Sequence, residues 1–104
     1  MSDYAELLAE DRRQFILGAL NEADDYRLND LSLKAVLERF GHRVGRDIVR
    51  ADLTWLTQHG LLRVERLGGD EPNGPSVWLS TLTENGQDVA RGRHHPGVAR
   101  RPPA

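Results

Sequence analysis

Residues 44–62 read VGRDIVRADLTWLTQHGLL, and this stretch contains the strongest secondary-structure signal in the chain. Its regularly spaced apolar positions are Val49, Leu53 and Leu56. Spacings of four and three predict a helix over about residues 46–59 with one buried stripe. Gly60 follows at the position where many helices end in a left-handed backbone. From Leu62 onward apolar and polar residues begin to alternate, which is typical of a strand.

A second helix is predicted immediately before this stretch, over about residues 30–40. Asn29 is a suitable N-cap residue, and Asp30 places a negative charge in the first turn. Gly41 lies where a left-handed backbone is needed after the last turn. The apolar face of this helix comprises Leu33, Val36, Leu37 and Phe40. The short glycine-flanked connection His42, Arg43 and Val44 then predicts a helix-turn-helix over about residues 30–59.

The flanking segments complete a single domain, predicted to span residues 1–92. Residues 3–22 have a helical period, and the charged run at 10–13 is compatible with either a break or one long helix. A short strand is possible at 26–28. Residues 61–67 and 76–82 predict a β-hairpin with a turn-rich loop of about eight residues. Thr83 is expected to cap a last helix at 84–91, and residues 93–104 are expected to form a flexible tail rich in proline and arginine.

Charge is distributed unevenly along the chain. The net charge is −2 over 104 residues, but residues 1–30 hold eight acids against three bases, whereas residues 31–66 hold seven bases against four acids. All bases except Lys34 are arginine. A basic middle segment is compatible with a nucleic-acid partner, because a docking face depends on local charge. The absence of cysteine, of a signal peptide and of a long apolar run predicts a cytoplasmic protein without a membrane anchor.

The predicted order of elements, mainly α with a small β-hairpin (α+β), is that of a winged helix-turn-helix. Residues 44–62 resemble the recognition helix and first wing strand of DeoR-type and ArsR-like winged-helix regulators. Leu82-Thr83-Glu84-Asn85-Gly86 resembles the LTxxG link that joins the wing to the last helix in the same superfamily. The whole chain, including residues 9–13 and 96–102, also resembles small ArsR-like proteins that are encoded by Mu-like phages and prophages.

The resemblance implies that helix 46–59 binds in the major groove of double-stranded DNA. The residues expected on its outward side are Arg46, Asp47, Arg50, Ala51 and Thr54. Arg46 and Arg50 are four residues apart, so they share a face and could reach neighbouring base edges or phosphates. The residues expected to contact the DNA backbone are Arg43, Lys34, Arg39, Arg63 and Arg66. The competing interpretation is a solvated face in which Arg46 and Arg50 pair with Asp47 and Asp52.

The favoured function is a homodimeric transcriptional regulator of phage or prophage type. The residues expected at the dimer interface are Tyr4, Leu7, Leu8 and Phe15, with core packing as the alternative. Two departures weaken the DNA interpretation: Ala51 stands where DeoR-type proteins often have a second arginine, and the wing loop at 69–72 is acidic. The rival function is therefore a winged-helix module that binds protein, for example in phage assembly or as a scaffold.

No pattern in the chain points to catalysis, a cofactor, a small-molecule substrate or a metal site. There is no nucleophile elbow, no HExxH motif and no phosphate-binding glycine loop. His42, His59, His94 and His95 lack the cysteines or spaced carboxylates that would complete a tetrahedral metal site. Trp55 and Trp78 are expected to pack in the core and the hairpin, with a partner surface as the alternative.

Overall fold

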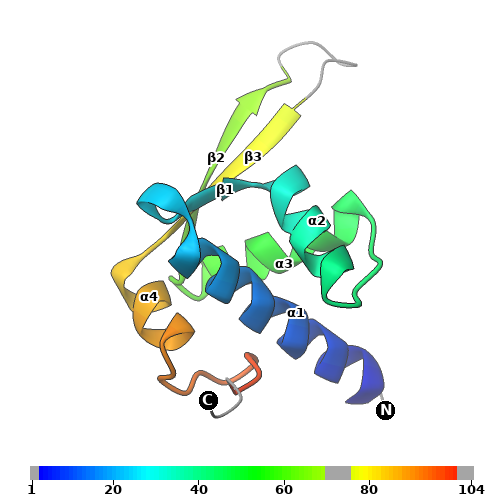
Figure 1. Cartoon of the computed structure of the whole chain (residues 1–104), viewed down its shortest axis with the longest axis vertical. Coiled ribbons are helices and arrows are strands. Elements are labelled where there is room, and N and C mark those ends of the chain that lie inside the picture. Colours follow the sequence, from blue (N-terminus) through cyan, green and yellow to red (C-terminus); the bar gives the residue numbers. More distant parts are fainter. Residues whose placement is uncertain (1–2, 70–75, 101–104) are drawn as a thin grey trace.

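The computed structural model describes residues 3–69 and 76–100. This part of the chain has an α+β fold with four α-helices and one three-stranded antiparallel sheet. In chain order the elements are α1 (Asp3–Glu22), the 3-10 helix η1 (Asp24–Tyr26), β1 (Arg27–Asn29), α2 (Asp30–Arg39), α3 (Arg46–Gln58), β2 (Leu62–Gly68), β3 (Ser76–Leu82) and α4 (Glu84–Ala90). Figure 1 shows the hairpin of β2 and β3 projecting away from the helices.

The first helix runs without a break through the charged segment at 10–13. Two arginines of this segment point into the domain and have partners there. Arg12 Nε donates to Asp52 on α3 at 2.6 Å, and Arg13 is almost completely buried. The contacts of Arg12 and Arg13 hold this turn against the domain, and the helix continues through it without a break.

The helices α2 and α3 begin and end at the residues that the sequence indicates. Asn29 Oδ1 accepts a hydrogen bond from the backbone amide of Ser32 at 2.8 Å and so caps α2. Gly41 has a φ of +95°, which lets the chain leave α2 directly toward α3. The core between the two helices and α1 contains the completely buried side chains of Leu33, Leu37, Val49, Leu53 and Leu56. Phe40 departs from the expectation, because it is 57% exposed and stacks on Phe15 at 4.8 Å between ring centroids.

The sheet has the order β1-β3-β2, so β3 is its central strand. The hairpin register runs from Leu62 opposite Leu82 to Gly68 opposite Ser76, which confirms the predicted pair of strands within one residue. The short strand β1 pairs with the other edge of β3 and leads directly into α2. The sheet therefore fixes the start of α2 next to the hairpin. The expected loop lies mostly outside the described residues.

The C-terminal strap, residues 92–100, differs from the expected flexible tail. Val98 is buried, the Ala99 amide donates to the Glu10 carbonyl at 3.1 Å, and the Gly97 carbonyl accepts from Arg13 Nη1 at 2.8 Å. Gly97 has a φ of +85° and contacts the Trp55 ring so closely that a β-carbon there would overlap with it. The strap packs as irregular backbone, so its residues show neither the helical nor the strand period that would have predicted its order. The last four residues, 101–104, lie outside the described residues.

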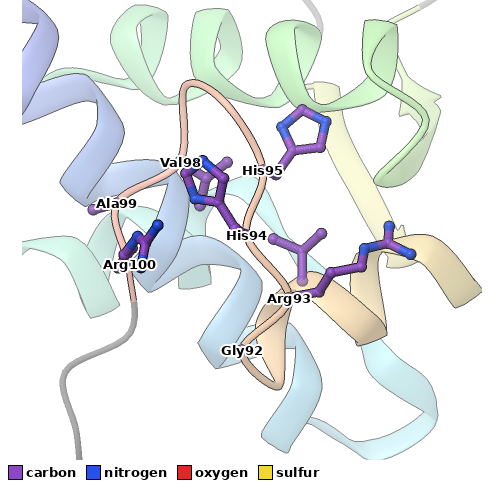
Figure 2. A pocket seen from close by; sticks show the side chains of 8 residues that line it. Gly92, Arg93, His94, His95, Val98, Ala99 and Arg100 are labelled. Atoms are coloured by element: carbon purple, nitrogen blue, oxygen red, sulfur yellow. The ribbon is translucent and has the colours of Figure 1, made fainter.

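The strap also places its histidines differently from a solvated tail. Figure 2 shows His95 pointing toward α3, where its ring meets Trp55 edge-on at 5.9 Å. The hollow that the strap encloses has a volume of about 10 Å³, which is room for little more than one water molecule. The hollow is therefore too small for anything much larger than a water molecule.

The turn from β3 into α4 yields a test of the packing. Thr83 Oγ1 accepts from the Gly86 amide at 3.0 Å, and a β-carbon on Gly86 would overlap with the Leu61 carbonyl. We expect Gly86→Ala to lower the free energy of unfolding by about 2–3 kcal/mol, because the obstacle is backbone and cannot move aside. Urea denaturation followed by circular dichroism measures this change.

Gly18 offers the matched control, since a β-carbon there meets only a Gln14 side-chain atom at 3.9 Å. Gly18→Ala should stabilise the isolated protein by up to about 1 kcal/mol through helix propensity. Equal effects of the two substitutions would contradict the close approach at Gly86.

Candidate nucleic-acid interface

A completely buried carboxylate, that of Asp30, lies where α2, α3 and β3 meet. Arg46 Nε and Arg50 Nε donate to its Oδ2 at 2.7 and 2.8 Å. The backbone amide of Trp78 donates to its Oδ1 at 3.1 Å. Asp30 is 0% exposed, so its charge is compensated by these partners and not by water. The first residue of α2 thus fixes the first two turns of α3 against the hairpin.

The two arginines, Arg46 and Arg50, are called the arginine pair below. Each also donates from Nη2 to the Ser76 carbonyl, in the case of Arg50 at 3.0 Å. Within the described residues, the Nη1 atom of neither arginine has a hydrogen-bond partner. The Arg46 side chain is 34% exposed and that of Arg50 is 24% exposed. Both guanidinium groups are therefore held from inside, while each side chain as a whole is still partly exposed.

The surroundings of Asp30 change its ionisation. Burial raises the pKa of Asp30, but the hydrogen bonds from Arg46, Arg50 and the Trp78 amide together lower it more. The resulting pKa is about 2, against an ordinary value of 3.8. The carboxylate is consequently ionised at neutral pH, and with the arginine pair it forms a cluster of net charge +1.

The arginine pair continues into a cation-aromatic stack on the hairpin. The guanidinium carbon of Arg50 lies 4.9 Å from the centroid of the Trp78 ring, and that of Arg66 lies 4.5 Å from it. Beside the stack, a groove of about 200 Å³ separates α3 from the hairpin and is lined by Thr54, Thr57, Gln58, Val64, Arg66 and Trp78. Three of the predicted basic residues therefore lie along one side of α3 and the hairpin.

The other predicted contact residues are more dispersed. Asp47, Ala51 and Thr54 are exposed on α3, as expected, and Thr54 Oγ1 donates to the Arg50 carbonyl at 2.9 Å. Arg39 and Arg43 are exposed and have no hydrogen-bond partner in the described part of the chain. Lys34 is committed to an exposed ion pair with Glu38 at 2.8 Å.

Arg63 does not join the arginine pair. Successive residues of a strand point to opposite faces, and Arg66 faces Trp78 across the hairpin. Arg63 instead faces Thr81 and lies with Arg27 and Leu79 beside a second hollow. Arg63 and Arg66 are three positions apart, so in a strand of period two they lie on opposite faces of the hairpin.

The alternative interpretation, in which Arg46 and Arg50 pair with Asp47 and Asp52, is wrong for the described residues. Asp52 lies on the inward side of α3, where it binds Arg12, and Asp30 takes its place as partner. In the sequence, Asp30 is recognisable only as an acid in the first turn of a helix, and no pattern connects Trp78 or Ser76 to the arginines. No spacing rule links residue 30 to residues 46 and 50, so nothing local could have revealed the cluster.

The residues proposed for dimerisation divide into two groups. Tyr4 and Leu7 are 77% and 62% exposed, and Leu8 is also exposed, so these three do not pack in the core. Phe15 is half-buried and covered by Phe40. The first two turns of α1 thus present an apolar surface without a partner in the described chain.

The histidines contact neighbouring side chains, and the described residues contain neither a metal-binding group nor a membrane-spanning helix. His42 Nε2 lies 2.7 Å from Asp11 Oδ2, and His59 stacks on Trp55 at 3.7 Å. No group of three metal-ligating side chains was found among residues 3–69 and 76–100. Over the same residues, every helix is too short or too polar to cross a bilayer.

The pKa of Asp30 predicts how stability depends on pH. Because the folded-state value lies below the ordinary one, ionised Asp30 stabilises the fold fully above about pH 4, and this contribution of about 2 kcal/mol is lost as the pH falls toward 2. Asp30→Asn should lower the free energy of unfolding by roughly 2–4 kcal/mol at neutral pH. Urea titrations of the wild type and of Asp30→Asn measure the difference between their free energies of unfolding. This difference should be smaller near pH 2.5 than at neutral pH.

Asp24→Asn is the matched control, since Asp24 is exposed on η1 and should change stability by less than about 0.5 kcal/mol. A difference between wild type and Asp30→Asn that stays constant down to pH 2.5 would show that the charge of Asp30 is not what stabilises the junction.

Comparison with known proteins identifies relatives that match most of the chain. No protein-family model matches the sequence. The chain is 38% identical over 97 residues to gp26, an uncharacterized protein of Escherichia phage Mu, with 93% of each chain covered. It is 41% identical over 64 residues to an uncharacterized protein of Haemophilus influenzae, with 62% of each chain covered. The protein therefore belongs to the phage Mu gp26 family.

Proposed function

We propose that this protein is a winged helix-turn-helix DNA-binding protein in which α3 enters the major groove and the β2–β3 hairpin serves as the wing. We further propose that it acts as a homodimeric transcriptional regulator of phage or prophage type. The observation that carries the proposal is the arginine pair, which Asp30 holds in place while each arginine side chain remains partly exposed.

The anchoring of the arginine pair favours recognition of an anion or a base edge. A free arginine loses rotamer freedom when it binds, whereas Arg46 and Arg50 are already ordered by Asp30 and Ser76. Their unpartnered Nη1 atoms can donate to phosphate oxygens or to the acceptors of guanine. Since Asp30 neutralises one of the two charges, the expected contribution is orientation more than non-specific attraction.

The outward side of α3 is compatible with close approach to a groove. Asp47, Ala51 and Thr54 are exposed and have short side chains, so they leave the helix backbone accessible to base edges. Arg66 lies on the hairpin against Trp78, where it could contact the DNA backbone beside α3. Arg43 follows α2 and is exposed at the start of the turn. Arg43 and Arg66 therefore flank a centre in which Asp47 is the one charged side chain among these three outward residues.

A protein-binding role is the second candidate, and the same cluster supplies its argument. If Arg46 and Arg50 serve only to hold α3 against the hairpin, their hydrogen bonds to Asp30 fulfil that purpose and no DNA is required. The exposed Tyr4 and Leu7 would then be the surface that binds a partner. In the DNA-binding role the Nη1 atoms of Arg46 and Arg50, which have no partner among the described residues, donate to DNA. In the protein-binding role they do not.

The test is fluorescence anisotropy with a labelled mixed-sequence duplex of about 20 base pairs over a salt series. Arg46→Lys/Arg50→Lys keeps the net charge and can keep an ion pair with Asp30, but removes the forked guanidinium. We expect the wild type to bind with a log–log salt slope of about 3–4, corresponding to phosphate contacts by Arg43, Arg46, Arg50 and Arg66. The double variant should bind roughly tenfold more weakly.

Arg91→Lys/Arg93→Lys is the matched control, because these arginines follow α4 and are exposed away from the proposed interface. It should bind DNA as the wild type does. If the wild type does not bind at low salt, the DNA proposal fails and the protein-binding role takes its place. If both double variants bind as tightly as the wild type, DNA is attracted by positive charge alone and α3 is not a defined interface, because Arg→Lys keeps the charge.

A further inference from the structure

One face of the sheet carries two arginines on either side of a threonine. Thr81 of β3 pairs with Arg27 on β1 and with Arg63 on β2. Directly opposed residues of antiparallel strands share a face of the sheet, so these three side chains lie in one row across it. Ser80 and Leu82, the neighbours of Thr81, are buried on the other face. The three residues are called the Arg-Thr-Arg row below, and their face is called the outer face.

The Arg-Thr-Arg row borders a hollow of about 260 Å³, which is called the outer hollow. Its lining residues are Arg27, Arg63, Val64, Glu65, Leu79 and Thr81. The strands β1 and β2 are the two edges of the sheet, about 9–10 Å apart at twice the spacing of neighbouring strands. Figure 1 shows β1 beside the base of the hairpin. Two long arginine side chains can therefore reach one group placed above Thr81.

The charges of the Arg-Thr-Arg row are not neutralised within the described part of the domain. Arg27 and Arg63 are exposed, and neither has a hydrogen bond or an ion pair among residues 3–69 and 76–100. The Thr81 hydroxyl has no hydrogen-bond partner among the same residues. Glu65 lines the outer hollow but forms an ion pair with neither arginine. Two guanidinium groups against one carboxylate leave the outer hollow with a net charge of +1.

The chemistry of this lining fits a phosphate group. Guanidinium groups donate to phosphate oxygens in strong charge-assisted hydrogen bonds, and a hydroxyl can donate to a further oxygen. Leu79 is half-buried and gives the outer hollow an apolar wall, which suits an organic group attached to the phosphate. The volume lies just below the range of about 300–1,000 Å³ that is usual for drug-sized ligands. These features together favour a small phosphate monoester.

The duplex of the proposed function does not fit the outer hollow. Arg66 pairs with Trp78, and both lie on the face of the hairpin that meets α3. The Arg-Thr-Arg row lies on the opposite face, because side chains alternate along a strand. A duplex bound by α3 would therefore remain on the other side of the sheet from the outer hollow.

We propose that the Arg-Thr-Arg row binds the phosphate group of a small phosphate monoester in the outer hollow. Arg27 and Arg63 donate to phosphate oxygens from the two sides, and Thr81 Oγ1 donates between them. The bound phosphate connects β1 to β2, which do not pair with each other. Because β1 leads directly into Asp30, the ligand also holds the strand that precedes the Asp30 cluster. This inference goes beyond the proposed function and does not depend on DNA binding.

The test is isothermal titration calorimetry of the full chain at low ionic strength with phenyl phosphate, and with phenol as the ligand that lacks the phosphate. We expect saturable binding of one phenyl phosphate per chain and no binding of phenol. Arg27→Gln/Arg63→Gln should weaken binding roughly tenfold or more, because two charged donors are lost. Glu65→Gln should tighten binding roughly threefold, because a carboxylate no longer repels the phosphate.

Arg93→Gln/Arg100→Gln is the matched control, since it removes the same charge from exposed positions of the C-terminal strap that do not line the outer hollow. It should bind phenyl phosphate as the wild type does. Circular dichroism checks that both double variants are folded. Thr81→Val removes only the hydroxyl and should weaken binding roughly fivefold, so it tests the site even if Arg27→Gln/Arg63→Gln does not fold.

Several outcomes would overturn the inference. A wild type without saturable binding has no such site, equal affinity for phenol would show an apolar contact only, and equal weakening in both double variants would show attraction to net charge. Displacement of the labelled duplex by phenyl phosphate at matched ionic strength would assign the outer hollow to DNA and not to a free ligand. A wild type that binds phenyl phosphate but not the duplex would support this inference while the DNA proposal fails.

Discussion

The Asp30 carboxylate is the interaction on which the arrangement of α2, α3 and the hairpin depends. A buried charge is costly unless several donors satisfy it, and here two residues of α3 and one of β3 supply the donors to a carboxylate on α2. Loss of any one of these donors would leave the carboxylate partly unsatisfied. The cluster therefore fixes the position of α3 relative to β3 more strictly than apolar packing alone, which tolerates sliding. It also links stability to the proposed function, since the same arginines serve both.

A second ion pair holds α3 from the other side. Arg12 on α1 binds Asp52, while the neighbouring Arg13 lies over the Trp55 ring at 4.0 Å and contacts the C-terminal strap. Charged side chains on both sides of α3 therefore form ion pairs within the domain, Asp52 with Arg12 and the arginine pair with Asp30. The high arginine content has a structural explanation at these positions, so composition alone was a weak argument for nucleic acid. DNA binding is supported instead by the Nη1 donors of Arg46 and Arg50, which have no hydrogen-bond partner among residues 3–69 and 76–100.

The sequence predicted the helices and the hairpin because their signals are local. Periodicity at Val49, Leu53 and Leu56, the cap at Asn29 and the glycine at position 41 each act within a few residues. The Asp30 cluster joins residues 16 to 48 positions apart, and no periodic pattern encodes such contacts. The strap was missed for a related reason, since its order depends on Trp55 and Arg13, which are distant in sequence. Phe40 had the right period for the core, but it lies at the edge of α2, where Phe15 covers it only in part.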